Sequence, residues 1–448
     1  MKTDRYHYID LLRIIAILMM FVYHVFMVFA ADWDWHIKNM ETSNTLLEIN
    51  YWMASFRMPL LFFVSGYISY ILMQRLGLKA FVMQRQYRIH ITGLVLLFAV
   101  VALQAQQTVP AEKMQKIYEE IKTPYKYGLV VTADNSTKKI DCPSVFRKGK
   151  YWYMTWIQFD GRGYETWLSK SKDLLNWTTL GKIMSFSDTA DWDNNQKAGY
   201  TALANTKWEG SYKLKKYKGR YWLSYIGGKE RGYESGQLAI GLASTKRNPA
   251  KPHEWDRLPN PVLSATDSAV RWWENKKLYK SSIIWDKSKT TGYPFVMYYN
   301  ANGDTSNNTP KWRWFERIGM AVSNDMIHWE RYKTDPVVHH KIGITGDGVI
   351  QKIGDLWVMF YFGAFWEGRK DAFNRFACSY DLVNWTDWTG EDLVHPSEDY
   401  DAKYAHKSYV VKWKGVVYHF YCAVDQKDNR GIALITSLNM GSSQLVFK

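Results

Sequence analysis

The stretch YWYMTWIQF (Tyr151–Phe159) sets the pattern for most of the chain, because similar aromatic runs return four more times. Each run is rich in Trp, Tyr, Phe and Val, and Gly, Asn and Asp residues separate it from its neighbours, which is typical of strands and turns. The other runs are Tyr221–Gly228, Phe295–Ala301, Leu356–Gly363 and Val416–Ala423. Five copies of a strand-rich unit predict an all-β five-bladed propeller over residues 125–448.

A second repeat, Ser-x-Asp-x-x-x-Trp, follows three of the aromatic runs, at Ser171–Trp177, Ser323–Trp329 and Ser379–Trp385. An Asp in this place can accept hydrogen bonds from backbone N–H groups, and the Trp can pack between neighbouring units. We therefore expect these Asp residues to shape an outer turn rather than to catalyse. A short helical lead-in over residues 107–124, with a helix at 111–122, is expected before the first blade.

Polar residues precede four of the aromatic runs by one strand and a turn, at Asp141, Glu209, Asp347 and His406. Because the innermost strands of a propeller surround one central channel, these side chains are expected to converge there. In glycoside hydrolysis one carboxylic acid protonates the leaving oxygen, and a second carboxylate activates water or attacks the sugar. A neighbouring like charge raises the pKa of the acid, which then keeps its proton near neutral pH. The predicted catalytic residues are Asp141, Glu209 and Asp347.

Aromatic and imidazole side chains near the same mouth are expected to contact the substrate. The predicted substrate-binding residues are His406, Trp208 and Trp285. His406 has a second predicted role, in which it helps to hold a structural calcium ion or a water cluster at the axis. We expect no cofactor to be required for the reaction.

Residues 125–440 resemble the five-bladed propeller glycosidases of family 43 and the related furanosidases and fructosidases. Asp141-Cys-Pro-Ser resembles their Asp-Pro-Ser motif, whose Asp is the general base, and Glu209-Gly-Ser resembles their Glu-Gly-Pro motif, whose Glu is the general acid. Cys142 interrupts the first motif, and the Glu motif falls in the second repeat instead of the third. The pKa-tuning Asp of the family has no clear match, and Asp347 is expected to fill that role. The alternatives for it are Asp191, Asp193 and Asp286.

The first hundred residues differ in composition from the rest of the chain. Residues 9–31 and 51–73 are almost entirely apolar, and about 20 such residues suffice to cross a bilayer. Basic residues precede the first stretch and follow the second, whereas the loop between them is acidic, which predicts two membrane spans with the loop outside. Arg13 and His24 lie close to three helical turns apart, and therefore on one face of the first helix.

This first stretch, with its Arg and His, resembles the first span of the acyltransferase family 3 membrane proteins, and Phe56–Tyr67 resembles their second span. That family transfers acyl groups onto sugars, and the resemblance implies that Arg13 and His24 lie at the acyl-donor site. The resemblance covers about residues 4–82, whereas the family needs some ten spans. We therefore expect residues 1–82 to be a truncated acyltransferase-like transmembrane segment without activity.

Residues 83–106 have two interpretations. Arg85 and Arg88 precede a short apolar run, Thr92–Leu103, and Gln-Ala-Gln follows it, which is the layout of a secretory signal peptide. The alternative is a third membrane span. Both interpretations predict an extracytoplasmic propeller, which is periplasmic or secreted, or else anchored in the bacterial inner membrane.

The net charge of +15 comes from scattered Lys and Arg residues without a dense basic tract, so nucleic acid is not an expected partner. Three Cys residues in 448 exclude a disulfide scaffold. The expected function is an extracytoplasmic glycoside hydrolase that cleaves polysaccharide or oligosaccharide fragments, with a carbohydrate as its partner. The open alternatives are a non-catalytic glycan-binding propeller, phosphorolysis in place of hydrolysis, and membrane O-acyltransferase activity of the N-terminal segment.

Overall fold

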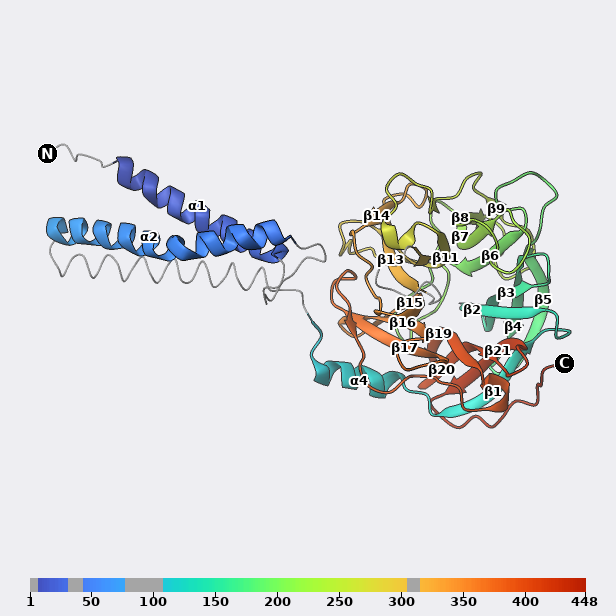
Figure 1. Ribbon diagram of the computed structural model, residues 1–448. Coiled ribbons are helices and arrows are strands. Elements are labelled where there is room, and N and C mark those ends of the chain that lie inside the picture. The colour runs from blue at the N-terminus through green and yellow to red at the C-terminus, as the bar shows by residue number, and fades with distance from the viewer. Residues whose placement is uncertain (1–6, 31–42, 77–107, 304–314) are drawn as a thin grey trace. The chain divides into compact units, whose positions relative to one another are not determined.

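The computed structural model describes residues 7–30, 43–76, 108–303 and 315–448 (Figure 1). Two compact units divide the chain, Met1–Ala105 and Gln106–Lys448. The segment 83–106 lies outside the described residues, so a signal peptide and a third span both remain predictions for it.

The first unit contains, within its described residues, the helices α1 (His7–Phe29) and α2 (Asn44–Leu76). Tyr23 of α1 and Met53 of α2 are buried in one small apolar cluster. No helix in the described part of the chain is both long enough and apolar enough to cross a membrane. The prediction of two membrane spans, at residues 9–31 and 51–73, is therefore not supported.

The described part of the second unit begins with α4 (Ala111–Ile121), close to the predicted helix at 111–122. Met114, Ile117 and Ile121 recur at helical spacing and form the buried side of α4. They pack into an apolar cluster with strand residues such as Val358 and Phe360. This burial, rather than intrinsic propensity, holds so short a helix in place.

Most of the rest of this unit is strands in antiparallel groups, with short 3-10 helices at Trp272–Glu274 and Asp399–Asp401, and each aromatic run is the second strand of its group. The first two groups are β2 (Lys139–Lys148), β3 (Tyr151–Phe159), β4 (Tyr164–Ser171) and β5 (Trp177–Met184), then β6 (Gln196–Thr201), β7 (Tyr221–Gly228), β8 (Leu238–Thr245), β9 (Asp256–Arg257) and β10 (Leu263–Ser264). The next two are β11 (Lys277–Trp285), β12 (Phe295–Asn302), β13 (Phe315–Ser323) and β14 (Glu330–Tyr332), then β15 (Gly343–Ile353), β16 (Leu356–Ala364), β17 (Ala372–Ser379) and β18 (Thr386–Asp387). The last group is β19 (Tyr404–Trp413), β20 (Val416–Val424), β21 (Arg430–Thr436) and β1 (Tyr125–Thr132).

The arrangement of these groups is propeller-like (Figure 1). The inner strands contact one another in the cyclic order β2, β6, β11, β15, β19 and back to β2. β1 pairs with β21, so the beginning and the end of the strand-bearing unit share one sheet. Within the described residues the strands form four sheets, because a short parallel pairing of β13 with β15 merges two groups into one ladder.

The Ser-x-Asp-x-x-x-Trp repeats form the predicted turns. Asp173 Oδ1 accepts hydrogen bonds from the backbone N–H groups of Leu175 (2.9 Å) and Asn176 (2.8 Å). Trp177 Nε1 donates to the Leu174 carbonyl at 3.0 Å. Asp325 and Asp381 bind their own turns in the same way.

Candidate active site

A shared backbone irregularity aims side chains of the inner strands at the axis. β2, β11, β15 and β19 each break register with the second strand of their group at the same level, between Asp141/Ser144, Leu278/Ser281, Gly346/Val349 and His406/Tyr409. Such bulges redirect side chains and are frequent beside active sites. Cys142, Asp347 and Lys407 lie in these bulges with positive φ values of 50°, 59° and 61°. This backbone conformation is uncommon for residues other than glycine.

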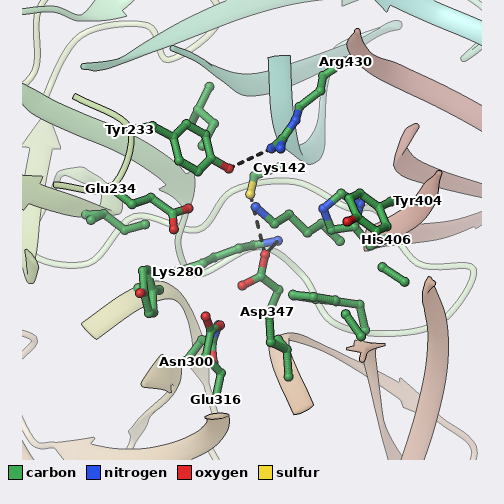
Figure 2. Close-up of a pocket in the computed structure, with 18 of the residues that line it drawn as sticks. Cys142, Tyr233, Glu234, Lys280, Asn300, Glu316, Asp347, Tyr404, His406 and Arg430 are labelled. Carbon is green, nitrogen blue, oxygen red and sulfur yellow. Dashed lines mark hydrogen bonds and ion pairs between the residues drawn. The ribbon is translucent and has the colours of Figure 1, made fainter. Parts of the chain in front are cut away.

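The bulges line a cavity of about 300 Å³ (Figure 2). Cys142, Lys280, Asp347 and Lys407 reach it from four different inner strands. Its size lies at the lower end of the range of small-molecule sites.

A network of charges lies beside this cavity. Lys407 Nζ donates to Asp141 Oδ2 at 2.6 Å, and Arg430 Nη1 lies 3.7 Å from the same oxygen. Arg430 also donates to the Tyr233 hydroxyl at 2.7 Å (Figure 2). Burial acts to raise the pKa of Asp141, but the positive charges of Lys407 and Arg430 keep it below its ordinary value. Asp141 is therefore a buried carboxylate that is already paired.

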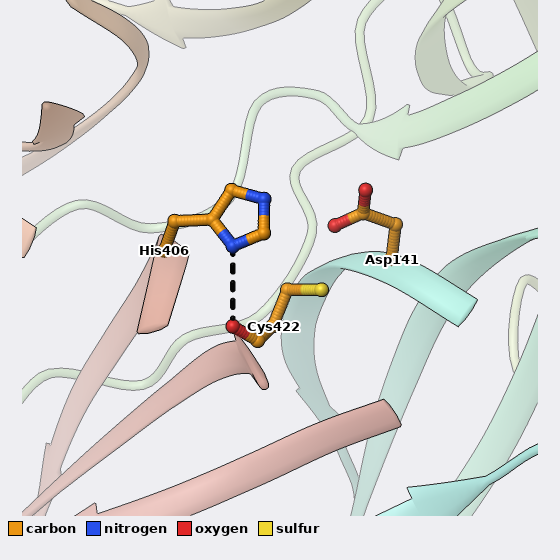
Figure 3. A group of neighbouring side chains, drawn as sticks. All are labelled: Asp141, His406 and Cys422. Atoms are coloured by element: carbon orange, nitrogen blue, oxygen red, sulfur yellow. Dashed lines mark hydrogen bonds between the residues drawn. The ribbon is translucent and has the colours of Figure 1, made fainter. Parts of the chain in front are cut away.

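His406 lies beside Asp141 and Cys422 (Figure 3). Its Nδ1 is 3.3 Å from the Cys422 carbonyl, which can only accept, so the proton of the neutral ring is on Nδ1. Burial, together with the charges of Lys407 and Arg430, lowers the pKa of His406 to about 3. The ring is therefore neutral in the physiological range.

The predicted calcium role of His406 does not fit this group. Asp141, His406 and Cys422 offer one oxygen, one nitrogen and one sulfur within 4.8 Å, whereas calcium takes six to eight oxygen ligands. The single carboxylate is already paired with Lys407. A cation there would also face the positive charge of Arg430.

Asp347 projects into the cavity from the β15 bulge. Its Oδ2 lies 3.9 Å from Lys280 Nζ, and Cys142 Sγ approaches the same oxygen at 3.6 Å (Figure 2). The side chains of Lys280 and Asp347 are each 3% exposed. The structure thus brings together three of the predicted residues, Asp141, Asp347 and His406. Asp347 lies within its bulge, as Cys142 and Lys407 do, whereas Asp141 immediately precedes the bulge of its strand.

Two further carboxylates line the cavity, Glu234 and Glu316. Glu234 lies in the connection between β7 and β8, and Glu316 is the second residue of β13. Burial and the negative charge of Glu234 raise the pKa of Glu316 to about 8. Burial also raises the pKa of Glu234, while the positive charge of Lys407 opposes that effect.

Hydrogen bonds hold both carboxyl groups. Asn300 Nδ2 donates to Glu316 Oε2 at 2.7 Å. The Tyr164 hydroxyl donates to Glu234 Oε1 at 3.3 Å. Each group therefore has one fixed oxygen, and this pair meets the chemical requirement of glycoside cleavage, with one carboxyl that keeps its proton and a second beside it.

Aromatic rings form part of the wall. Phe362, Phe365 and Tyr404 line the cavity, and the ring of Phe362 meets that of His406 edge to face at 5.4 Å. Figure 2 shows Tyr404 and His406 on the side of the cavity opposite Glu234. Apolar ring faces beside polar groups suit a sugar, which has both kinds of surface.

Glu209, which was predicted to be catalytic, does not line this cavity. The inner strand of its group is β6 (Gln196–Thr201), and residues 202–220 contain only isolated bridges. Glu209 is exposed, and its Oε1 accepts a hydrogen bond from the Gly415 N–H (2.9 Å) in the turn between β19 and β20. That turn lies at the end of β19 opposite His406.

Trp208 and Trp285, predicted to bind substrate, do not line the cavity either. Trp208 is buried, stacks on Phe360 at 6.2 Å and donates through Nε1 to Glu120 of α4 at 2.7 Å. Trp285 is half-buried against the rings of Tyr217 and Phe295. Both side chains pack the interior instead of facing a ligand.

The alternative aspartates of the sequence analysis do not line the cavity. Asp193 is buried in an ion pair with Arg257, which also reaches Asp191. Asp286 accepts hydrogen bonds from the backbone N–H groups of Ser288 and Thr290. All three have structural partners outside the site.

Five residues of the site were not predicted from the sequence: Glu234, Glu316, Lys280, Lys407 and Arg430. The predicted residues come from the stretches before the aromatic runs, whereas Glu234, Glu316 and Arg430 lie in a connection or at the start of a third strand. Lys280 and Lys407 do lie in the stretches before the aromatic runs, but a lysine is not one of the carboxylic acids that glycoside cleavage requires. The start of each third strand, which faces the same mouth, was the available signal.

The acyltransferase-like residues belong to the first unit. His24 is exposed, and its Nδ1 lies 2.7 Å from the Met20 carbonyl oxygen one turn earlier in α1. The side chain of Arg13 lies outside the described residues. Their predicted role in acyl transfer stays a prediction.

Comparisons with known proteins match the N-terminal part and the strand-rich part of the chain to different proteins. Residues 6–114 match a family model described as an acyltransferase domain. Over 77 residues the chain is 32% identical to the glucans biosynthesis protein C of Escherichia coli strain K12, an alignment that covers 17% of this chain and 20% of that protein. The chain thus spans 20% of the length of the curated relatives that it matches.

Solved structures match the second unit. One, a complex whose name gives BT0996 and RGII, is 52% identical, with a TM-score of 0.73, and the match covers 76% of this chain and 99% of that protein. A second, named glycoside hydrolase, is 51% identical with the same coverage and TM-score. A family 117 glycoside hydrolase of the marine bacterium Zobellia galactanivorans, 15% identical with a TM-score of 0.50 over 71% of this chain and 91% of that one, shares the fold alone. Because half of the residues are identical over nearly the whole of a solved relative, the protein belongs to the glycoside hydrolases.

Proposed function

We propose that the cavity is the active site of a glycosidase in which Glu316 is the general acid and Glu234 is the partner carboxylate. The observation that carries this proposal is that Glu316 and Glu234 line one cavity, where burial and the charge of Glu234 raise the pKa of Glu316 to about 8. At neutral pH such a group holds a proton that it can give to the leaving oxygen of a glycosidic bond.

The contacts of Glu316 indicate which oxygen carries the proton. Asn300 Nδ2 donates to Oε2, so this oxygen acts as an acceptor. The proton is therefore expected on Oε1. Asn300 orients the acid without occupying the oxygen that reacts.

Glu234 is suited to the second role. Burial raises its pKa, and the positive charges of Lys407 and Arg430 oppose that effect. A carboxylate in this position attacks the sugar directly in a retaining mechanism, or activates a water molecule in an inverting one. The anomeric form of the first product, followed by NMR, distinguishes the two.

Asp141 then has a supporting role in place of the predicted general base. Its ion pairs fix Lys407 and Arg430, and both of these cations line the cavity. A carboxylate with two cationic partners and a lowered pKa is a weak base.

We further infer that the cyclic groups of strands act as five blades and that the substrate is a carbohydrate of the kind in the relative's name, RGII. We also propose that the enzyme acts outside the cytoplasm and that, as in family 43, a carboxylic acid and a carboxylate at the propeller axis cleave the bond. Phosphorolysis and binding without cleavage are the competing functions. Turnover of a panel of aryl glycosides, with and without phosphate, separates all three.

The test of the acid is Glu316→Gln with two leaving groups on the same sugar. A methyl glycoside needs a proton to leave, so its turnover is expected to fall about 10³-fold. A 2,4-dinitrophenyl glycoside needs none, and its first cleavage step should change little. Equal loss with both leaving groups, or no loss with either, would contradict the role of Glu316.

A further inference from the structure

Four polar atoms of the residues that line the cavity are buried without a hydrogen-bond partner: Tyr200 Oη, Lys280 Nζ, Asn300 Oδ1 and Arg430 Nε. Lys280 Nζ belongs to a side chain that is 3% exposed, and Asn300 Oδ1 belongs to a residue that is also 3% exposed. Both residues line the cavity. Burial of an unsatisfied charged donor costs free energy, so a group that is not part of the protein is expected to meet Lys280.

The β11 bulge explains why Lys280 is there. The register of β11 with β12 skips from Leu278/Ala301 to Ser281/Tyr299, so Lys280 lies in the bulge opposite Asn300. The Lys280 ammonium is 5.5 Å from the centroid of the Tyr200 ring, which stabilises a cation there. The bulge therefore holds a desolvated positive charge at the wall of the cavity.

Asp347 provides the complementary acceptor. Its Oδ2 lies 3.9 Å from Lys280 Nζ, which is longer than a direct hydrogen bond (Figure 2). A donor and an acceptor at this separation can each reach one of two neighbouring hydroxyl groups, because a hydroxyl both donates and accepts. A pair of adjacent hydroxyls is a common feature of sugars, and a monodeoxy derivative that lacks one of the two hydroxyls no longer offers that pair.

We propose that Lys280, Asn300 and Asp347 select the terminal sugar of the substrate by two adjacent hydroxyl groups. Lys280 Nζ donates to one hydroxyl oxygen, which in turn can donate to Asn300 Oδ1, and Asp347 accepts from the neighbouring hydroxyl. The proposal rests on the proposed glycosidase function and adds which part of the substrate the site recognises, a pair of adjacent hydroxyl groups. These residues are positioning residues for the sugar and take no part in bond cleavage.

The test is direct binding, because binding does not depend on cleavage. Wild-type protein and Lys280→Met are titrated with D-galactose, D-xylose, L-arabinose and L-rhamnose and with their monodeoxy derivatives, and binding is followed by ligand-observed NMR. Lys172→Met, at an exposed position of the first outer turn, is the matched control. A sugar hydroxyl bound by a charged group contributes roughly 10- to 100-fold in affinity.

The expected result is that at least one sugar binds the wild type and the control. One of its monodeoxy derivatives should bind the wild type tenfold or more weakly. Lys280→Met should bind the parent and that derivative equally. The proposal is overturned if no sugar in the panel binds, or if every monodeoxy derivative binds the wild type as well as its parent; the latter means that water, not sugar, meets Lys280.

The two proposals fail separately. If the monodeoxy preference is present but Glu316→Gln leaves turnover unchanged, the hydroxyl site stands and the catalytic assignment is wrong. If turnover depends on Glu316 while the monodeoxy derivatives bind equally, the hydroxyl site is wrong. The wild-type measurement needs no variant, so a failure of Lys280→Met to fold does not remove the test.

Discussion

Carboxylates lie near both ends of the inner strands, and the two ends differ in what surrounds those groups. At the end where the strands begin, Asp347 is buried beside Lys280, and Glu234 and Glu316 line the same cavity. At the opposite end, Glu209 is exposed and binds a backbone N–H in a hairpin turn. The comparison teaches that residue type alone does not make a catalytic acid, since the raised pKa of Glu316 depends on burial and on a second carboxylate.

The largest expected effect compares the same substitution at the two ends. Glu234→Gln removes the partner carboxylate and should lower kcat/KM for an aryl glycoside by about 10³-fold or more. Glu209→Gln removes an exposed group outside the cavity and should leave kcat/KM within about twofold of the wild type. A similar loss in both variants would remove the distinction between the two ends.

The next prediction compares the loss of stability when a lysine is replaced at either end of β19. Lys407→Met leaves Asp141 buried with Arg430 at 3.7 Å as its remaining cationic partner, and should lower the free energy of unfolding by about 3–5 kcal/mol at neutral pH. Lys414→Met, in the exposed turn, should change it by less than about 0.5 kcal/mol. Urea unfolding measures both.

The difference in unfolding free energy between the wild type and Lys407→Met should depend on pH. Because the pKa of folded Asp141 is below its ordinary value of 3.8, its pairing stabilises the fold above that pH and is lost as the pH falls. The difference between the wild type and Lys407→Met should therefore shrink on acidification below about pH 4. A difference that is constant from pH 7 to pH 3 would contradict the pairing.

Replacement of an aromatic residue should lower stability at one end of the inner strands and weaken substrate binding at the other. Trp208→Ala removes a buried ring that packs on Phe360 and should cost about 3 kcal/mol of unfolding free energy with KM unchanged. Tyr404→Ala removes a ring of the cavity wall and should raise KM about tenfold. A raised KM in Trp208→Ala at unchanged stability would restore its predicted role in substrate binding.

A smaller effect is expected in the pH profile of the wild type. Since the general acid must be protonated, kcat/KM should fall as the pH rises through about 8, where Glu316 loses its proton. Glu209→Gln should keep the same alkaline limb. A profile that begins to fall near the ordinary value of 4.5 would assign the acid to another group.

The sequence was sufficient for the repeated elements of the fold. The aromatic runs coincide with the second strands β3, β7, β12, β16 and β20, because burial on both faces requires such continuous apolar runs. The outer turns followed from the spacing of Asp and Trp. These features are local, so a short stretch of sequence contains their cause.

The site was less accessible from the sequence because its geometry is not local. The bulges place Cys142, Asp347 and Lys407 at positive φ without a glycine to mark the position. The inner strand β6 was missed because a long excursion, residues 202–220, separates it from its partner β7. Glu234 and Glu316 come together through the closure of the ring, which no single stretch reveals.

The most direct test of the account is the titration of the Glu316 side chain itself. Carbon-13 NMR of protein labelled at the Glu carboxyl carbon, assigned by its loss in Glu316→Gln, should show a group with a pKa of about 8. In Glu234→Gln the pKa of this group should fall, because the neighbouring negative charge is gone. A Glu316 carboxyl that titrates near 4.5, and that does not respond to Glu234→Gln, would contradict the central claim.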